Sequence, residues 1–200
     1  MSVRLALANL YLPKGTIRKQ LLHVEEETNE ALDELLAAQV PNYKAPLVDH
    51  ATKDLDAIRQ RMAVGHKQRV RVLTQALGKE KATELARRAL FEAGTKLGRE
   101  ARISLGVRDD PRDLEKAARV MYRLLGIEIS LNLQGGKGQM LVHRCALARG
   151  YDADTCAVLC ATDEGVVKGI SDRAKLKFRS YLTSGEKACV AELTFEGGAG

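Results

Sequence analysis

The first two-thirds of the chain has apolar residues at every third or fourth position, with charged residues between them. This spacing places the apolar side chains on one face of a helix and is typical of helices that pack against a core. Pro41 and Pro46 interrupt the pattern, and Gly78 and Gly126 come where two of the helices are expected to end. The pattern therefore predicts helices over residues 16–39, 53–77, 80–105 and 111–125, with a linker at 40–50.

Beyond the fourth helix, apolar and polar residues alternate one by one. Residues 127–133 follow this period of two, which is typical of a half-buried strand. The glycine-rich segment 135–138 predicts a turn into a partner strand, and a second hairpin is expected within 175–195. A helix over 152–167 lies between the two hairpins. The predicted fold class is therefore α+β, a helical N-terminal portion followed by a small antiparallel sheet of two hairpins with an intervening helix.

These elements predict three parts of the chain. Residues 1–50 form an N-terminal helical segment and linker, and residues 51–196 form a single α+β domain. The glycine-rich residues 197–200 are expected to be a disordered tail.

Charge and composition narrow the possible partners. The chain has 32 Lys and Arg against 26 Asp and Glu, and its basic residues are mixed with acidic ones. Aromatic residues make up only 4% of the chain, so few side chains can stack on nucleic-acid bases. Nucleic acid is therefore not an expected partner. The densest basic segment, 59–71, is either a solvated helix face or an anion-binding surface. No apolar run is long enough to cross a membrane, and residues 5–10 are too short for a signal-peptide core, so a cytoplasmic location is expected.

All four cysteines lie in the last third of the chain, at Cys145, Cys156, Cys160 and Cys189. Cys156 and Cys160 are one helical turn apart and share a face. Disulfides are disfavoured in the cytoplasm, so clustered thiols indicate a metal site, with zinc or an iron–sulfur cluster as its occupant, or a nucleophile. The alternative is that all four are small buried apolar residues. The spacing does not distinguish zinc from iron–sulfur.

Two histidines and two glycines are further candidates. His143 precedes Cys145 by two residues, so on a strand the two side chains share a face, as a general base or ligand would need. A structural histidine is the alternative. His66 lies in the second helix and is a candidate for a pocket. Gly94 and Gly98 are four residues apart, which indicates either close helix packing or a substrate cavity opened by the missing side chains.

Asp163 and Glu164 follow the cysteine-bearing helix segment directly. Paired carboxylates can carry out acid–base chemistry. Because Gly165 follows at once, the interpretation favoured here is a solvated helix end.

Four short segments resemble a known family. They are LGKEKA at 77–82, EAGTKLG at 92–98, VHRCAL at 142–147 and LTSGEKAC at 182–189. Together they resemble the L-2-amino-thiazoline-4-carboxylic acid hydrolase-like family, which is similar to the vinyl-reductase-type small-molecule-binding domains. The chain departs from the pattern at Ala146, where the family usually has proline, and at Tyr181, where sensor-type relatives have a further cysteine.

The resemblance implies a ligand-binding α+β domain, often a homodimer, with a cysteine-rich site near the last hairpin. The implied reaction is ring-opening hydrolysis of a C=N bond in a small sulfur- and nitrogen-containing heterocycle. Metal-bound hydroxide at the four cysteines, or Cys145 assisted by His143, would supply the nucleophile. The alternative function is a non-enzymatic small-molecule or redox sensor.

Overall fold

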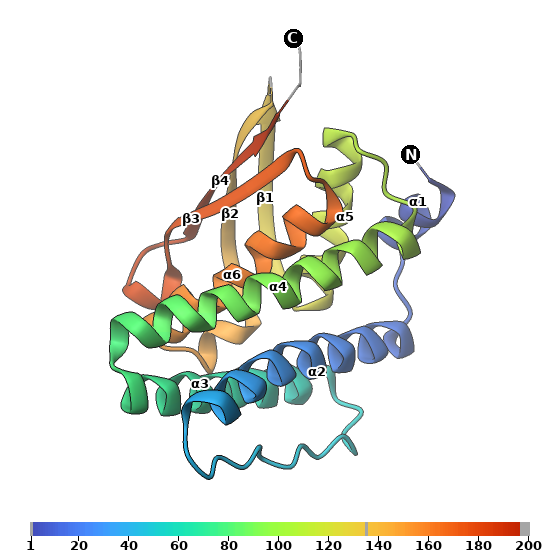
Figure 1. Ribbon diagram of the computed structural model, residues 1–200. Helices are drawn as coiled ribbons and strands as arrows, with labels where there is room; N and C mark the ends of the chain where they lie inside the picture. Colours follow the sequence, from blue (N-terminus) through green and yellow to red (C-terminus); the bar gives the residue numbers. More distant parts are fainter. Residues whose placement is uncertain (1, 135, 197–200) are drawn as a thin grey trace.

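An antiparallel sheet with helices on one face and across one end makes up the structure, shown as a computed structural model in Figure 1. The structure describes residues 2–134 and 136–196. The helices are α1 (Val3–Leu10), α2 (Lys14–Gln39), α3 (Leu55–Leu77), α4 (Lys79–Leu105), α5 (Pro111–Leu124) and α6 (Ala153–Ile170). The strands are β1 (Ile127–Gln134), β2 (Lys137–Cys145), β3 (Ala174–Ser180) and β4 (Cys189–Phe195), with 3-10 turns η1 (Ala146–Arg149) and η2 (Leu182–Ser184).

The sheet combines the two predicted hairpins. Its strand order is β1-β2-β4-β3, and every neighbouring pair is antiparallel. Along β3 the buried Ala174, Leu176 and Phe178 alternate with exposed residues, so one face of the sheet meets the helices. The predicted α+β fold class is confirmed. The predicted tail at 197–200 lies outside the described residues, and the division at residue 50 stays a prediction.

Helices α1, α3, α5 and α6 begin at residues whose side chains accept hydrogen bonds from the first turn. At α3, Asp54 accepts from the backbone N–H of Asp56. Asp110 accepts from first-turn N–H groups of α5, and Asp152 accepts from one of α6. The sequence pattern missed α1, whose eight residues are too few to show a helical period. Its N-terminus is capped by Ser2 in the same way.

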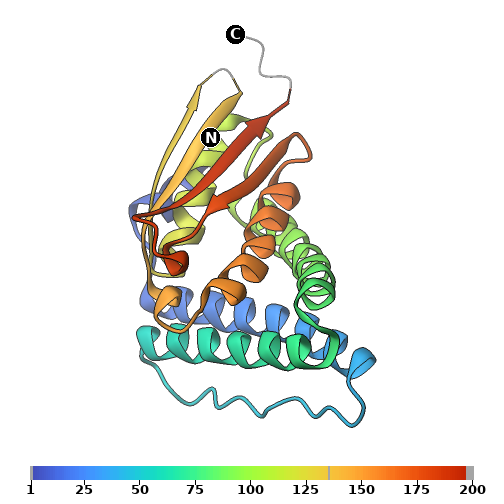
Figure 2. The same ribbon diagram turned by 90° about the vertical axis from the view of Figure 1, so that its left-hand side faces the viewer.

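The layers of the fold are visible from two directions. Helices α5 and α6 lie against the sheet, α4 packs on α6, and α2 and α3 lie side by side across the end of the sheet (Figure 2). The larger apolar cluster fills the space between the sheet, α5 and α6. A second cluster joins α2, α3, α4 and α6. The end of the sheet that faces α2 and α3 is therefore enclosed on several sides.

Helices α4 and α6 pack backbone against backbone. A Cβ atom added at Gly94 would lie 2.1 Å from the carbonyl oxygen of Thr162, and one at Gly98 would lie 2.2 Å from that of Val166. On α6, Gly165 and Gly169 meet α4 at similarly short distances. The substrate-binding role predicted for Gly94 and Gly98 is therefore wrong, because α6 already occupies the space that their missing side chains leave.

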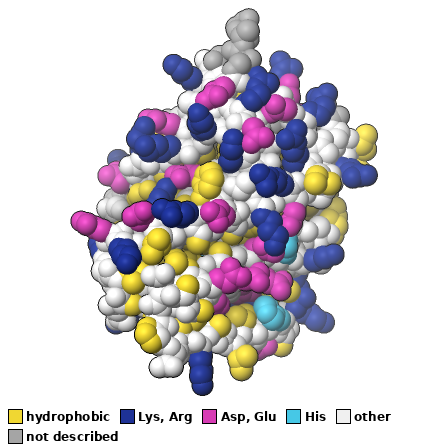
Figure 3. Space-filling model, viewed as in Figure 1, with side chains coloured by type: hydrophobic (Ala, Val, Ile, Leu, Met, Phe, Trp, Pro, Cys, Tyr) yellow, Lys and Arg dark blue, Asp and Glu magenta, His cyan; other side chains and the backbone are white. Residues whose placement is uncertain are grey.

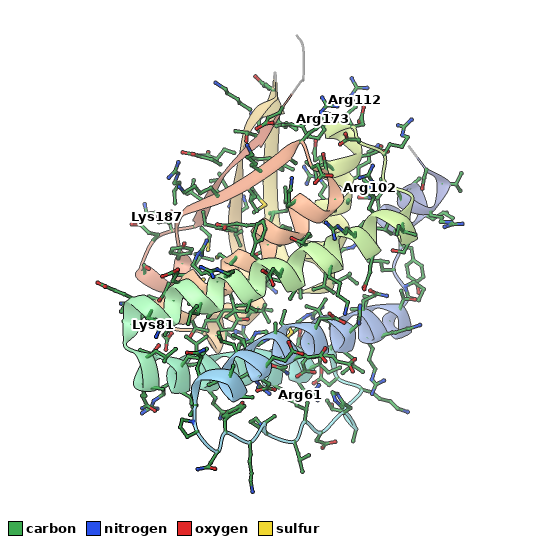
Figure 4. All side chains as sticks on the ribbon, in the orientation of Figure 1. Arg61, Lys81, Arg102, Arg112, Arg173 and Lys187 are labelled. Atoms are coloured by element: carbon green, nitrogen blue, oxygen red, sulfur yellow. The ribbon has the colours of Figure 1, made fainter. Side chains whose placement is uncertain are left out.

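The surface carries mixed charge on the face seen in Figure 3, where basic and acidic side chains are interspersed. The six basic residues labelled in Figure 4 come from α3, α4, α5 and two loops, and Arg61 among them pairs with the buried carboxylate of Glu25. In the described part of the chain, no helix is both long and apolar enough to cross a membrane.

Candidate functional site

A cavity of about 80 Å³ lies where the end of the sheet meets α2, α3, α5 and α6. Most of its lining is apolar. All four cysteines line it, so we name it the cysteine cavity. Its other polar groups are Thr28, His66, Tyr122, Tyr151, Thr162 and Asp163. A mostly apolar cavity with a few convergent polar groups is typical of a small-molecule site.

The four cysteines reach this cavity from three elements. Cys156 and Cys160 project from α6, Cys145 ends β2, and Cys189 begins β4. The backbone N–H of Leu182 donates a hydrogen bond of 3.2 Å to the sulfur of Cys189. The structure thus brings together four thiols that are up to 44 residues apart in the sequence.

The four cysteines are also candidates for a metal centre. Among the described residues, no group of three or more His, Cys, Asp or Glu side chains is placed to hold a metal ion. The donor set as it lies therefore does not fit zinc or an iron–sulfur cluster. Such a centre stays a prediction.

The thiols of the cavity are held in their neutral form. Burial raises the pKa of Cys145 to about 11, and a hydrogen bond to Cys160 raises that of Cys156 to about 12. The pKa values of Cys160 and Cys189 are raised as well. Because the thiolate is the nucleophile, these side chains are poorly suited to attack a substrate near neutral pH.

Alkylation should therefore be slow. At about pH 8, we expect iodoacetamide to modify the folded protein at least about 100-fold more slowly than the same protein in denaturing urea, because few thiolates are present. Peptide mass mapping over time measures the rate at each cysteine. Rapid modification of Cys145 in the folded state would contradict this prediction and support Cys145 as a nucleophile.

His143 does not share a face with Cys145. Glu128 pairs with Arg144 and Ile129 pairs with Val142, so His143 is an extra residue in β2 without a partner on β1. This β-bulge breaks the alternation of the strand. Cys145 therefore faces the cavity, whereas His143 is exposed and lies 2.8 Å from the Ser130 hydroxyl. The prediction of a shared face is wrong, and this geometry gives no support to a catalytic His143–Cys145 pair.

His66 does line the cysteine cavity and is 2% exposed. Its Nε2 lies 2.8 Å from the Thr28 hydroxyl and its Nδ1 lies 2.8 Å from the Tyr151 hydroxyl. The Thr28 hydroxyl donates its hydrogen to the carbonyl of Val24, so we assign the imidazole proton to Nε2, which donates to Thr28. Nδ1 then accepts from Tyr151. A substrate-binding role for His66 stays a prediction.

Burial also sets the charge of this histidine. Desolvation, reinforced by the nearby charge of Arg69, lowers the pKa of His66 to about 3. The imidazole is consequently neutral at physiological pH. A ligand in the cavity meets no positive charge from this residue.

Asp163 is the carboxyl group of the cavity. It lies on α6 one turn beyond Cys160 and faces inward, whereas its neighbour Glu164 forms an ion pair of 2.7 Å with Arg87. Burial raises the pKa of Asp163 to about 7, against an opposing effect of the Tyr122 hydroxyl. The two groups interact electrostatically, but the hydroxyl does not reach hydrogen-bonding geometry.

The interpretation of Asp163 as part of a solvated helix end is therefore wrong. Helix α6 continues past Gly165 to Ile170, because this glycine makes room for α4 rather than ending the helix. A signal was present in the sequence. Asp163 continues the helical stripe of Cys156 and Cys160, and Val167 extends it, which indicates an inward direction.

A second cavity of about 60 Å³ adjoins the first. The two share the lining residues Val24, Tyr122, Leu125, Thr162 and Asp163. We call these five residues the shared wall. The remainder of the second cavity is apolar except for Gln20. Both cavities therefore meet at the same three polar side chains.

Comparison with known families decides the relationship of the chain. The model of the family described as L-2-amino-thiazoline-4-carboxylic acid hydrolase matches residues 56–192. The chain belongs to this family. The match spans α3 to β4, and so includes all four cysteines and Asp163 of this L-2-amino-thiazoline-4-carboxylic acid hydrolase family member. A comparison with curated protein sequences found no match.

Three solved structures have a similar course of the chain. A trafficking protein particle complex subunit 3 from Naegleria fowleri, covalently bound to palmitic acid, has a TM-score of 0.49 and 13% identity, covering 69% of this chain and 95% of its own. The phenol-responsive sensory domain of the transcription activator PoxR, with phenol, has a TM-score of 0.47 and 16% identity, covering 70% and 77%. An H-NOX domain from Shewanella oneidensis has a TM-score of 0.45 and 13% identity, covering 90% and 98%. Similarity at this level carries no functional information.

Proposed function

We propose that this protein binds a small heterocycle in the cysteine cavity and hydrolyses a C=N bond in it, with Asp163 as the general acid–base. The observation that carries the proposal is the position of Asp163, a carboxyl group that lines an apolar cavity. Among the described residues that line this cavity, none is Lys or Arg. Membership of the hydrolase family supports the reaction class.

Asp163 is better suited to this role than the other candidates. A general base works best when its pKa lies near the working pH, and burial brings the pKa of Asp163 to about 7. The cysteines are neutral thiols, and His143 lies outside the cavity. An activated water is therefore the favoured nucleophile, in place of a thiolate.

The reaction needs only water and proton transfer. The ring reacts with its C=N nitrogen protonated. The carboxylate of Asp163 takes a proton from water as the water oxygen bonds to the carbon of C=N, and the π electrons move to the nitrogen, which becomes neutral and keeps its proton. Asp163 then gives its proton to this nitrogen as the carbon–nitrogen bond breaks and the bonding electron pair leaves with the nitrogen. The hydroxyl oxygen becomes the carbonyl oxygen and returns its proton to Asp163. The products are a carbonyl and an amine, and no oxidant or reductant is needed.

Thiols, hydroxyls and the ion-paired carboxylate of Glu164 surround this carboxyl group. The groups that couple electrostatically to it come from α5, α6, β2, β4 and the segment before α6. They are Tyr122, Cys145, Tyr151, Cys160, Glu164 and Cys189. None of them is a cation, so we expect the hydrolysis rate to rise with pH through about pH 7 as Asp163 loses its proton.

Turnover tests the proposal directly. We expect the protein to open the ring of 2-amino-2-thiazoline or a derivative, seen by mass spectrometry as the addition of one water. The rate should fall at least about 100-fold in Asp163→Asn, which cannot accept the proton. The matched control is His143→Ala, which should retain the wild-type rate because His143 lies on the outer face of β2.

Two outcomes would contradict the proposal. One is an Asp163→Asn variant that keeps the wild-type rate. The other is a wild-type protein that binds these rings without opening them, which would favour the role of a non-enzymatic small-molecule sensor.

A further inference from the structure

The charge of the two cavities restricts what they can bind. Asp163 is the one charged side chain in their described lining, and Lys and Arg are both absent from it. His66 is neutral, and both of its ring nitrogens are already occupied by Thr28 and Tyr151. A carboxylate that entered either cavity would lose its hydration without gaining a cationic partner, and it would be repelled by Asp163.

The shared wall also contains unused hydrogen-bonding groups. The Tyr122 hydroxyl and the Thr162 hydroxyl are buried and have no hydrogen-bond partner among the described residues. Tyr122 is 6% exposed, so this hydroxyl has no access to bulk water. Buried polar atoms without partners are uncommon in native proteins and call for an explanation, of which a bound ligand is one. Both residues line the two cavities together with Asp163, so a polar group of a ligand in this wall would meet all three.

From these two observations we infer that the ligand is a carboxylate-free nitrogen base of the amidine type, seated on Tyr122, Thr162 and Asp163. A protonated amidine presents two N–H groups side by side, which match the two oxygens of a carboxylate. The inference rests on the site of the proposed function and names the substrate class for it. It departs from the family description, whose substrate carries a carboxylic acid.

The second cavity accommodates the apolar remainder of such a ligand. Its walls beyond the shared residues are formed largely by Leu21, Leu97, Leu114, Met121, Val166 and Ile170. An apolar substituent there gains from burial, whereas a carboxylate at the same ring position would be placed among these side chains. The amino-thiazoline ring of the family substrate fits the shared wall by its chemistry, but the described lining offers its acid group no Lys or Arg to pair with.

A matched pair of ligands tests this inference. The probes are L-2-amino-2-thiazoline-4-carboxylic acid, its methyl ester and unsubstituted 2-amino-2-thiazoline, each titrated into the full-length protein by calorimetry. The acid and the ester share ring and stereochemistry and differ in the charge. We expect the ester and the unsubstituted ring to bind at least tenfold more tightly than the acid.

Two variants connect the preference to Asp163. Asp163→Asn should weaken binding of the unsubstituted ring at least tenfold and should not weaken binding of the acid. Asp172→Asn removes an equal charge at an exposed residue beyond α6 and should leave both affinities unchanged. Circular dichroism verifies that each variant is folded.

The outcomes separate this inference from the proposed function. Acid binding as tight as ester binding, or no binding of any of the three probes, overturns the inference. Hydrolysis of a tightly bound acid would keep the proposed function while overturning the inference. Tight binding of the ester and the unsubstituted ring without hydrolysis would keep the inference and overturn the proposed function.

Discussion

The Asp163→Asn variant is expected to be more stable than the wild-type protein at about pH 8, although it loses activity. The folded protein holds the proton of Asp163 up to about pH 7, whereas an unfolded chain releases it near 3.8. Between these values the folded state binds more protons, so its free energy of unfolding falls as the pH rises. At pH 8 the ionised form costs roughly 4 kcal/mol of stability, since each unit of pKa shift corresponds to about 1.4 kcal/mol.

Thermal unfolding across the pH range measures this effect. For a chain of this size, the variant should melt roughly 8–16 °C higher than the wild type at about pH 8, and the difference should nearly vanish by about pH 4. The control is Asp172→Asn, whose carboxylate is exposed and lies 2.9 Å from Lys168, and it should bring no gain at pH 8. An Asp163→Asn protein no more stable than wild type at pH 8 would show that the ionised carboxyl group does not destabilise the folded state. A gain in stability combined with a loss of turnover is expected of an active-site residue.

Alanine at Gly98 should have the opposite effect on stability. Its Cβ would lie 2.2 Å from the carbonyl oxygen of Val166 and 3.0 Å from the Cα of Gly169, so the backbones of α4 and α6 must separate. We expect the free energy of unfolding to fall by about 3 kcal/mol or more in urea titrations, because strain against backbone atoms has no side chain to absorb it.

The control for this substitution is Gly15→Ala. No atom lies within 4 Å of a Cβ at that position in the first turn of α2, so the change should be neutral or slightly stabilising. Wild-type stability in the Gly98 variant, together with a loss of ligand binding, would instead favour the interpretation that the glycines open a cavity.

The regular part of the fold could be predicted because its periodicities are local. Four helices lie within two residues of their expected bounds, and the two hairpins alternate as expected. The bulge at His143 could not be predicted this way. An extra residue reverses the alternation at one point, and the few residues from Val142 to Cys145 are compatible with either direction. The side chain predicted to face the cavity therefore faces solvent.

The candidate site was predictable only in part. The gathering of the cysteines follows from one helical turn and the neighbouring strand ends, whereas the inward position of Asp163 depends on how far α6 extends. The prediction ends that helix at residue 167 and places Asp163 at its solvated end because Gly165 follows, since a glycine near a helix end and one that receives a neighbouring helix look alike in a single sequence. The close approach of Gly165 to the backbone of Phe91 and Thr95 on α4 shows that it receives a neighbouring helix.

The glycine contact has a consequence for how the pocket can change. Helix α6 packs on α4 through main-chain atoms. Its position therefore does not depend on the side chains of its opposite face, where residues 156, 160 and 163 line the cavity. The two helices thus form a frame, and the side chains that line the cavity can be replaced without changing it. A library of substitutions at those three positions is thus expected to redirect ligand choice while the frame stays in place, which makes this helix a practical starting point for engineering new binding specificities.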